Sequence, residues 1–130
     1  MLKFFETPIR TVQETFGRHA ACYPEKTALI CGEDRLTWRE LNDRMNRVGN
    51  SLQRIGISKG EKACVLMPTM TETTEVMFGI VKAGAAMVPL SGLVQSETLA
   101  LMINDSDAKA IFVGPGLESL VAPIRDTLVN

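Results

Sequence analysis

Residues 62–90 read KACVLMPTMTETTEVMFGIVKAGAAMVPL, and this stretch decides the fold. Its first six residues form a compact apolar run that ends at a proline, as expected for a buried strand. A helix is predicted to begin at a Thr-x-x-Glu capping box formed by Thr69 and Glu72 and to end at Gly84. Because that helix is apolar nearly all round, we expect it to be buried on more than one side. The last six residues of the stretch form the second predicted strand.

The same alternation continues to the end of the chain. Ser96 is predicted to cap a short helix, a strand follows over residues 108–113, and a last helix covers residues 117–129. Strands that are continuously apolar and alternate with helices indicate a parallel sheet with helices on both faces, joined by right-handed crossovers. The predicted fold class is therefore α/β, as part of a doubly wound, mostly parallel sheet within one domain.

The chain before residue 62 predicts a helix, a β-hairpin and a longer helix. Four apolar residues recur at helical spacing ahead of Pro24: Ile9, Val12, Phe16 and Ala20. Two β-prone runs, residues 27–31 and 35–37, are joined by a link that contains Gly32, which is typical of a hairpin.

The longer helix has the clearest local signals in the sequence. Thr37 and Glu40 form a capping box at its start, and Gly56 is predicted to end it in the left-handed conformation. One face carries a regular apolar stripe, which we interpret as facing the core: Trp38, Leu41, Met45, Val48, Leu52 and Ile55.

Composition excludes several classes of function. The chain has 130 residues, 45% hydrophobic and 22% charged, with a formal net charge of -1. It therefore offers no basic field for nucleic acid or anionic lipid. Its cysteines, Cys22, Cys31 and Cys64, form no Cys-x-x-Cys pair, so we expect small buried thiols in a reducing compartment. No signal peptide and no transmembrane segment are predicted, and the expected location is cytoplasmic.

Glycine-rich turns are the first candidates for a nucleotide site in such a fold. Residues 114–119 follow a strand and precede a helix, but Ser119 replaces the third glycine of a dinucleotide fingerprint and Pro115 removes one backbone amide. We interpret this segment as a plain turn, with dinucleotide binding as the alternative. Residues 56–62 follow a helix and precede a strand, the reverse of a phosphate loop, and are interpreted as a connecting turn.

Single polar residues suggest no catalytic constellation. His19, the only histidine, flanks the apolar face of the first predicted helix and is interpreted as a structural residue. Asp105 and Asp107 lie in a polar turn and look solvated. No residue is therefore assigned to catalysis, to cofactor binding or to a metal.

Two motifs carry a resemblance to a known family. Residues 36–41, LTWREL, and residues 82–90, KAGAAMVPL, resemble the first two core motifs of the adenylate-forming, AMP-binding superfamily of acyl-CoA synthetase-like ligases. Three further segments match its style and order: residues 24–28, 56–62 and 104–109. The resemblance covers residues 9–113. Trp38, Thr69 and Ser91 depart from the residues usual in this family.

The resemblance implies that residues 1–130 are the N-terminal portion of the large adenylation domain. The remainder of that domain and the small C-terminal domain are absent from this sequence, as are the family's phosphate loop closing Pro-Lys-Gly and its Tyr-Gly-x-Thr-Glu segment. The chain alone is therefore expected to be inactive. An unpaired strand edge left by such a truncation would favour self-association, as a dimer.

For the whole protein, the resemblance implies a ligase that activates a carboxylic or fatty acid with ATP to an acyl-adenylate and transfers it to coenzyme A. ATP, magnesium and coenzyme A are the implied cofactors, and the rest of the polypeptide and a small carboxylic acid are the implied partners. This segment would supply scaffold, with Met77 and Phe78 as a hypothetical wall of the acyl or pantetheine channel. Two alternatives remain open: a free-standing, non-catalytic α/β binding or assembly module, and a small dinucleotide-binding oxidoreductase.

Overall fold

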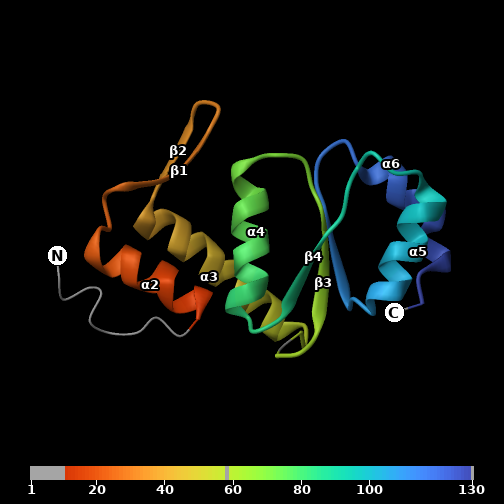
Figure 1. The fold of residues 1–130 in the computed structure, drawn as a ribbon, viewed down its shortest axis with the longest axis horizontal. Helices are drawn as coiled ribbons and strands as arrows, with labels where there is room; N and C mark the ends of the chain where they lie inside the picture. Colours follow the sequence, from red (N-terminus) through yellow and green to blue (C-terminus); the bar gives the residue numbers. More distant parts are fainter. Residues whose placement is uncertain (1–10, 58, 130) are drawn as a thin grey trace.

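The structure is a computed structural model that describes residues 11–57 and 59–129 (Figure 1). The predicted contribution of Ile9 to the first helix lies outside these residues. In chain order the elements are α2 (Val12–Cys22), β1 (Thr27–Cys31), β2 (Asp34–Thr37), α3 (Trp38–Arg54), β3 (Lys62–Leu66), α4 (Thr71–Lys82), β4 (Ala86–Pro89), α5 (Ser96–Ser106), β5 (Ala110–Val113), α6 (Glu118–Val121) and the 3₁₀-helix η1 (Ala122–Thr127).

The centre of the molecule is a three-stranded parallel sheet in the order β4-β3-β5. In Figure 1 it stands between α4 on one side and α5 and α6 on the other. Helices α3 and α4 cover the first face, whereas α5, α6 and η1 cover the second. The predicted α/β class, with helices on both faces of a parallel sheet, is confirmed.

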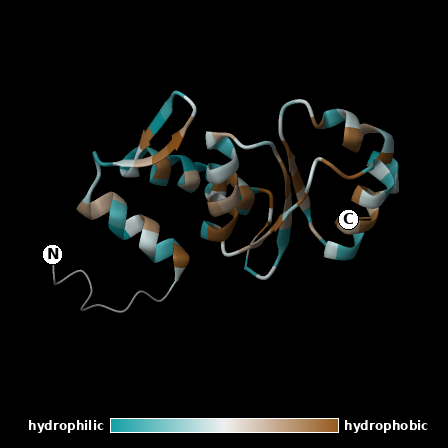
Figure 2. Cartoon of the chain, turned by 45° about the horizontal axis from the view of Figure 1, so that its top comes forward, coloured by the Kyte–Doolittle hydropathy of each residue, from teal (hydrophilic) through white to brown (hydrophobic). Residues whose placement is uncertain are grey.

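Alternation along β3 divides the core into two layers. Ala63 and Val65 pack towards α4, while Cys64 and Leu66 pack towards α5. All four are buried because β3 is the central strand and both of its faces are covered. Figure 2 shows hydrophobic colouring on the central strands and on parts of the helices on either side of them.

Helix α3 begins where the sequence predicts. The side-chain oxygen of Thr37 accepts a hydrogen bond from the Glu40 amide at 3.2 Å, and the Thr37 amide donates to Glu40 Oε2 at 2.8 Å, which completes the capping box. Gly56 has a φ of +87°, as predicted for the residue that ends the helix. The predicted stripe fails only at Ile55, which is 70% exposed because the helix ends at Arg54 and the chain turns away there.

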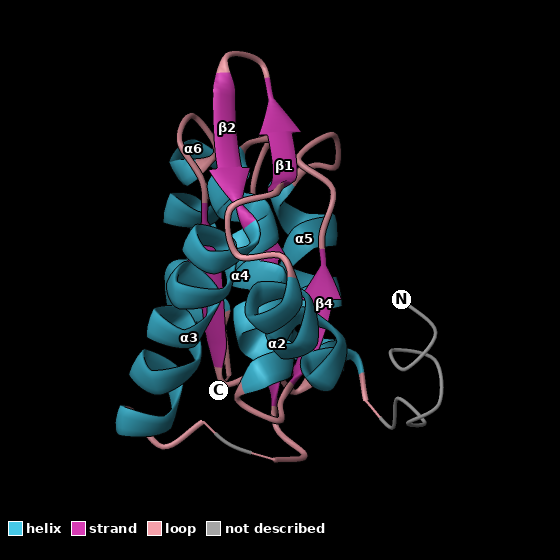
Figure 3. Ribbon diagram, turned by 90° about the vertical axis from the view of Figure 1, so that its left-hand side faces the viewer, coloured by secondary structure: helices cyan, strands magenta, loops and turns pink. Residues whose placement is uncertain are grey.

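The hairpin link is shorter than expected. Cys31 pairs with Asp34, so only Gly32 and Glu33 form the turn, and Gly32 has a φ of +58°. Glycine accommodates this left-handed conformation without steric cost. Figure 3 shows the hairpin projecting beyond the ends of the helices.

Two predicted helix starts were wrong. Helix α4 has Met70 as its N-cap with no side-chain hydrogen bond, because Glu72 accepts from Thr71 Oγ1 at 2.9 Å and Thr69 precedes the helix. Helix α5 has Gln95 as its N-cap, which places Ser96 inside the helix.

The last predicted helix is also divided. Helix α6 is only four residues long, and the chain tightens into η1 at its junction with Ala122. A proline occupies the start of η1, and its missing N–H cannot support a continuous α-helix through this point.

Candidate functional site

Helices α3 and α4 approach each other through backbone rather than through large side chains. A Cβ added to Gly79 would lie 2.5 Å from Val48 Cβ and 3.0 Å from the Met45 carbonyl oxygen. A Cβ on Gly49 would lie 3.2 Å from the Gly79 carbonyl oxygen. These distances leave no room for a ligand between the two helices at this crossing.

Two polar contacts fix the same helix pair. Arg44 Nη1 donates to Glu75 Oε1 at 2.9 Å, and Lys82 Nζ donates to Asn42 Oδ1 at 2.6 Å. Burial lowers the pKa of Lys82, and the negative charge of Asp43 partly opposes that shift. Lys82, the first residue of the second motif, therefore bridges α4 to α3. Sequence reasoning missed both contacts, because their partners are 31 and 40 positions apart.

An aromatic cluster joins α2 to the two following helices. The ring of His19 lies 4.6 Å from that of Trp38, and Phe16 lies 4.6 Å from Phe78, measured between centroids. His19 Nδ1 is also 2.8 Å from the carbonyl oxygen of Thr15. His19 is half-buried, as predicted, and Trp38 of the first motif forms part of the same cluster.

The two residues proposed to line a channel are engaged in packing. Phe78 faces α2 within the aromatic cluster, and Met77 packs against the core beneath α4. Neither side chain contributes to the cavities described below. The channel-wall hypothesis therefore gains no support from this structure.

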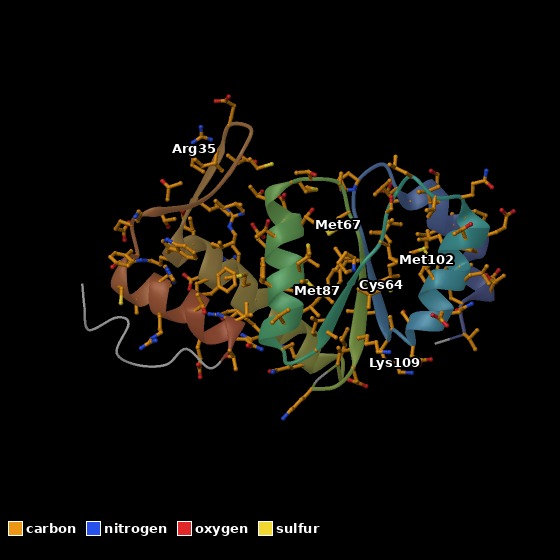
Figure 4. The ribbon with its side chains drawn as sticks, in the orientation of Figure 1. Arg35, Cys64, Met67, Met87, Met102 and Lys109 are labelled. Atoms are coloured by element: carbon orange, nitrogen blue, oxygen red, sulfur yellow. The ribbon has the colours of Figure 1, made fainter. Side chains whose placement is uncertain are left out.

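The carboxyl ends of β3 and β5 meet where the order of strands reverses, which is the usual ligand crevice of such sheets. Here that position is filled. A Cβ on Gly114 would lie 2.5 Å from Pro68 Cδ and 3.0 Å from Met67 Cα, and the Gly114 amide donates to the Leu66 carbonyl oxygen at 2.8 Å. Figure 4 shows Met67 at this end of the sheet and Lys109 at the other.

The turn that follows is likewise used internally. The amide of Leu117 donates to the Gly114 carbonyl oxygen at 3.2 Å, and Leu120 donates to Leu117 at 3.1 Å. A nucleotide phosphate would need those amides turned outwards at the start of a helix. The residues present therefore do not fit a dinucleotide or an ATP phosphate, and the plain-turn interpretation of residues 114–119 is the one the geometry supports.

The predicted connecting turn at residues 56–62 joins α3 to β3. One of its residues, Ser58, lies outside the described part of the chain. Gly60 donates to the carbonyl oxygen of Gly84, and a Cβ on Gly84 would lie 3.5 Å from Lys59. The turn therefore packs against the end of α4. Gly84 has a φ of +85°, which reverses the chain from α4 into β4.

The cysteines do not share one environment. Cys22 is exposed and Cys31 half-buried, so the expectation of three buried thiols was wrong; Cys22 lies in the last turn of α2, open to solvent. Cys64 is fully buried, its Sγ lies 3.5 Å from Ser106 Oγ, and burial raises its thiol pKa.

The prediction that Asp105 lies in a turn was wrong, because α5 continues to Ser106 and only Asp107 follows the helix. Asp105 and Asp107 are exposed, as predicted, and Asp107 ends α5 with a φ of +55°. Over residues 11–57 and 59–129, no three His, Cys, Asp or Glu side chains are grouped so that they could hold a metal ion. Nor does any helix in the described part of the chain combine the length and apolarity needed to cross a membrane.

Two apolar cavities border β5, one on each face of the sheet. The first, of about 340 Å³, lies between α3 and the sheet and is lined by Arg47, Val48, Ser51, Leu52, Ile55 and Phe112. The second, of about 470 Å³, lies between β5 and the last helices and is lined by Ile111, Val113, Glu118, Val121, Ala122, Arg125 and Leu128. No sequence signal indicated them.

Comparison with known proteins places this fold among adenylating enzymes. Residues 16–129 match the family model described as AMP-binding enzyme. The chain is 35% identical over 103 residues to surfactin synthase subunit 2 of Bacillus subtilis and 30% identical over 100 residues to the peroxisomal butyrate–CoA ligase of Arabidopsis thaliana. It superimposes with a TM-score of 0.87 on an anthranilate CoA ligase solved in complex with anthranoyl-AMP, at 27% identity over 95% of this chain.

The match covers only a small part of each of these proteins. The regions aligned take up 79% and 76% of this chain but only 3% of the surfactin synthase subunit and 18% of the butyrate–CoA ligase. The chain likewise spans 24% of the anthranilate CoA ligase.

Proposed function

The chain belongs to the AMP-binding enzyme family, and from this premise we propose that it is the N-terminal portion of an adenylation domain in an acid–CoA ligase. The whole protein would activate a carboxylic acid with ATP to an acyl-adenylate, and coenzyme A would then displace AMP to give a thioester. The observation that carries this proposal is the family match over residues 16–129, combined with the likeness to CoA ligases.

Within that protein, this segment would act as scaffold. Both motifs lie at junctions of the fold: the Thr37–Glu40 capping box starts α3, and Gly84 turns α4 into β4. The crevice between β3 and β5 is filled by Gly114, Met67 and Pro68. ATP, magnesium and coenzyme A are therefore proposed as ligands of the remaining chain, and no catalytic step is assigned to residues described here.

The first experiment is to sequence the source gene beyond the codon for Asn130 and to express the protein it encodes. We expect a Ser/Thr/Gly-rich loop that closes Pro-Lys-Gly, and exchange of radiolabelled pyrophosphate into ATP that depends on a carboxylic acid. Residues 1–130 alone serve as the inactive control. A stop codon at this point would contradict the proposal and favour a free-standing assembly module.

A second candidate acceptor is a carrier protein, as in peptide synthesis. The identity of 35% to surfactin synthase subunit 2 favours it. Once an acid that supports exchange is known, the same protein is offered coenzyme A or a phosphopantetheinylated carrier protein. A soluble acyl-CoA thioester supports the ligase, whereas acylation of the carrier alone supports the peptide synthetase.

Two further parts of the proposal concern the state of the protein. We propose that the isolated 130-residue chain self-associates as a dimer through the unpaired side of β5, and that the whole enzyme works in the cytoplasm. Light scattering tests the first, and fractionation of the source cells tests the second.

A further inference from the structure

Helix α2 is the outermost helix on its side of the sheet (Figure 1). None of its 11 residues is buried, whereas α3 has four buried residues and α4 has five. In a folded protein, segments with few buried contacts open at the lowest free energy. Helix α2 is therefore held in place by individual side-chain contacts, and no face of it is buried in the core.

The first of these contacts is aromatic and reaches the start of α3. The ring of Phe16 lies 4.6 Å from that of Phe78 in α4 and 6.1 Å from that of Trp38, measured between centroids. The ring of His19 lies one turn further along α2, and its plane is inclined by 33° to that of Trp38. Trp38 belongs to the first motif, at residues 36–41. One end of α2 is therefore attached to that motif.

The second contact, at the other end of α2, reaches the end of α4. Gln13 Nε2 donates to the carbonyl oxygen of Val81 at 2.7 Å, and the same oxygen accepts a hydrogen bond from the Gly84 amide at 3.0 Å. Val81 lies in the last turn of α4, directly before the second motif at residues 82–90. Helix α2 therefore contacts both segments that resemble the family motifs.

The chain that follows α2 is fixed to α3 through its backbone. The Arg39 amide donates to the carbonyl oxygen of Pro24 at 3.1 Å, and the Trp38 amide donates to that of Lys26 at 3.0 Å. These bonds involve no side chain of α2, so they persist when the contacts made by the helix break. The segment after α2 is therefore suited to act as a hinge.

We propose that α2 is a hinged strap. It opens about residues 23–26 while α3, α4 and the sheet stay folded, and when closed it joins the first motif, through Trp38, to the end of α4 at Val81. A helix as short as α2 is marginal in water by itself, so the opened strap also loses its helical hydrogen bonds. Every contact of the strap lies within the described residues, and the strap is therefore independent of the acid and the acceptor in the proposed function.

Native-state amide hydrogen exchange of the full chain, resolved by mass spectrometry of peptides, tests the strap. After correction for intrinsic exchange rates, the α2 amides should exchange on the order of a hundredfold faster than the most protected amides of α3 and β3. Equal protection of α2, α3 and β3 would show that α2 opens only when the whole fold does, which contradicts the strap.

A mild change on the opposite face of the sheet distinguishes local from global opening. Ile103→Val, in the cluster beneath α5, destabilises the fold but leaves the contacts of α2 intact. It should speed exchange in α3 and β3 by about 2- to 12-fold. The closed and the open strap both keep the sheet folded, so exchange in α2 should stay unchanged. A parallel rise in α2 would overturn the proposal.

The attachment to the end of α4 has its own variant. Gln13→Met keeps the length of the side chain and a similar helix propensity but removes the donor to Val81. It should speed exchange in α2 by about 2- to 12-fold. Gln53→Met, at an exposed position of α3, is the matched control and should leave α2 unchanged. Identical α2 exchange in the two variants would reject Gln13 as the point where the strap closes.

Discussion

The α3–α4 layer and the β5 edge are packed to different degrees within the same small domain. In the α3–α4 layer, Met45 is 0% exposed, Gly79 touches Val48 so closely that a methyl group would not fit, and Arg44 bonds to Glu75. At the β5 edge, cavities of about 340 and 470 Å³ remain on the two faces, and none of the four residues of the strand is fully buried.

The difference shows which apolar surfaces of the described residues are covered by other described residues and which are not. The two helices contact each other through close-packed glycines and the Arg44–Glu75 bridge, and residues of α2 and the hairpin cover Met45. This layer is therefore covered by described residues. Among the described residues, β5 pairs with a strand on one side only, which is β3. We therefore expect substitutions in the first region to change stability, and substitutions at the second to change association.

The largest effect is expected from shortening the buried side chain of Met45, in the middle of α3. Met45→Ala should lower the free energy of unfolding by about 2–5 kcal/mol, because it removes a fully buried side chain and leaves a cavity. Ile55→Ala, at the C-cap of the same helix and at the open cavity, should change it by less than about 0.5 kcal/mol. Urea titration followed by circular dichroism measures both. Equal losses would show that the β5 side is as tightly packed as the α3–α4 layer.

The next effect concerns the close approach of the two helices. Gly79→Ala should cost about 1–3 kcal/mol of unfolding free energy, because the new methyl group meets Val48 Cβ at 2.5 Å. The matched control is Gly17→Ala in α2, where no atom lies within 4 Å; there alanine should stabilise by about 0.5–1 kcal/mol. Thermal unfolding of the two variants compares them directly. A tolerated Gly79→Ala would mean that α3 and α4 can move apart.

A smaller change in stability should distinguish the helix cap observed at Thr37 from the cap that was predicted at Thr69. Thr37→Ala should cost about 1 kcal/mol, because it removes the acceptor for the Glu40 amide. Thr69→Ala should have little effect, since Thr69 caps no helix. Urea titration of both variants at neutral pH measures the difference. A comparable loss of unfolding free energy from Thr69→Ala would mean that Thr69 does cap α4, contrary to the structure.

The same cap predicts a dependence on pH. Hydrogen bonds from the backbone and side chain of Thr37 lower the pKa of Glu40 below its ordinary value. A carboxylate with a lowered pKa in the folded state stabilises the protein fully above its unfolded pKa of about 4.3, and that contribution disappears as the pH falls through the folded pKa. The stability difference between the wild type and Thr37→Ala should therefore shrink in acid. A difference that is constant down to low pH would contradict a role for the Glu40 carboxylate.

The smallest effect on stability should accompany a clear effect on association. Ile55→Glu places a charge on the rim of the cavity beside β5 and should reduce dimer formation by the isolated chain, because charged side chains discourage edge-to-edge pairing. Ile30→Glu, at a 60% exposed position in the hairpin, should leave association unchanged. Light scattering over a range of protein concentrations measures both. A monomeric wild-type chain at high concentration would contradict self-association itself.

The elements that sequence reasoning located correctly have strong local signals. The start of α3 follows from Thr37 and Glu40 within one turn, and the reversal after α4 follows from Gly84, where only a residue without a side chain turns easily. The errors fall where local signals compete. Thr69 and Glu72 have the right spacing for a capping box, but Glu72 is taken by Thr71. A continuous last helix was predicted over residues 117–129, but the proline at the start of η1 interrupts it.

The candidate site could be predicted in part. Absence of the fingerprint glycine at Ser119 indicated a plain turn, and the internal hydrogen bonds of Gly114 and Leu117 agree with it. Exposure of Cys22 could not be foreseen, because its position at a helix end is compatible with either environment. The bridges made by Arg44 and Lys82 were equally hidden, since each joins residues far apart in the sequence.

The sequence by itself determined the order of strands and helices, the α/β class and the resemblance to adenylate-forming ligases, because hydrophobic periodicity, caps and short motifs act over a few residues. Only the tertiary structure decided the order β4-β3-β5, the filling of the ligand crevice by Gly114 and the open cavities on either side of β5. The physical reason is that strand pairing and side-chain packing join segments tens of residues apart. Whether a surface is covered therefore depends on long-range contacts, which a local sequence pattern does not predict.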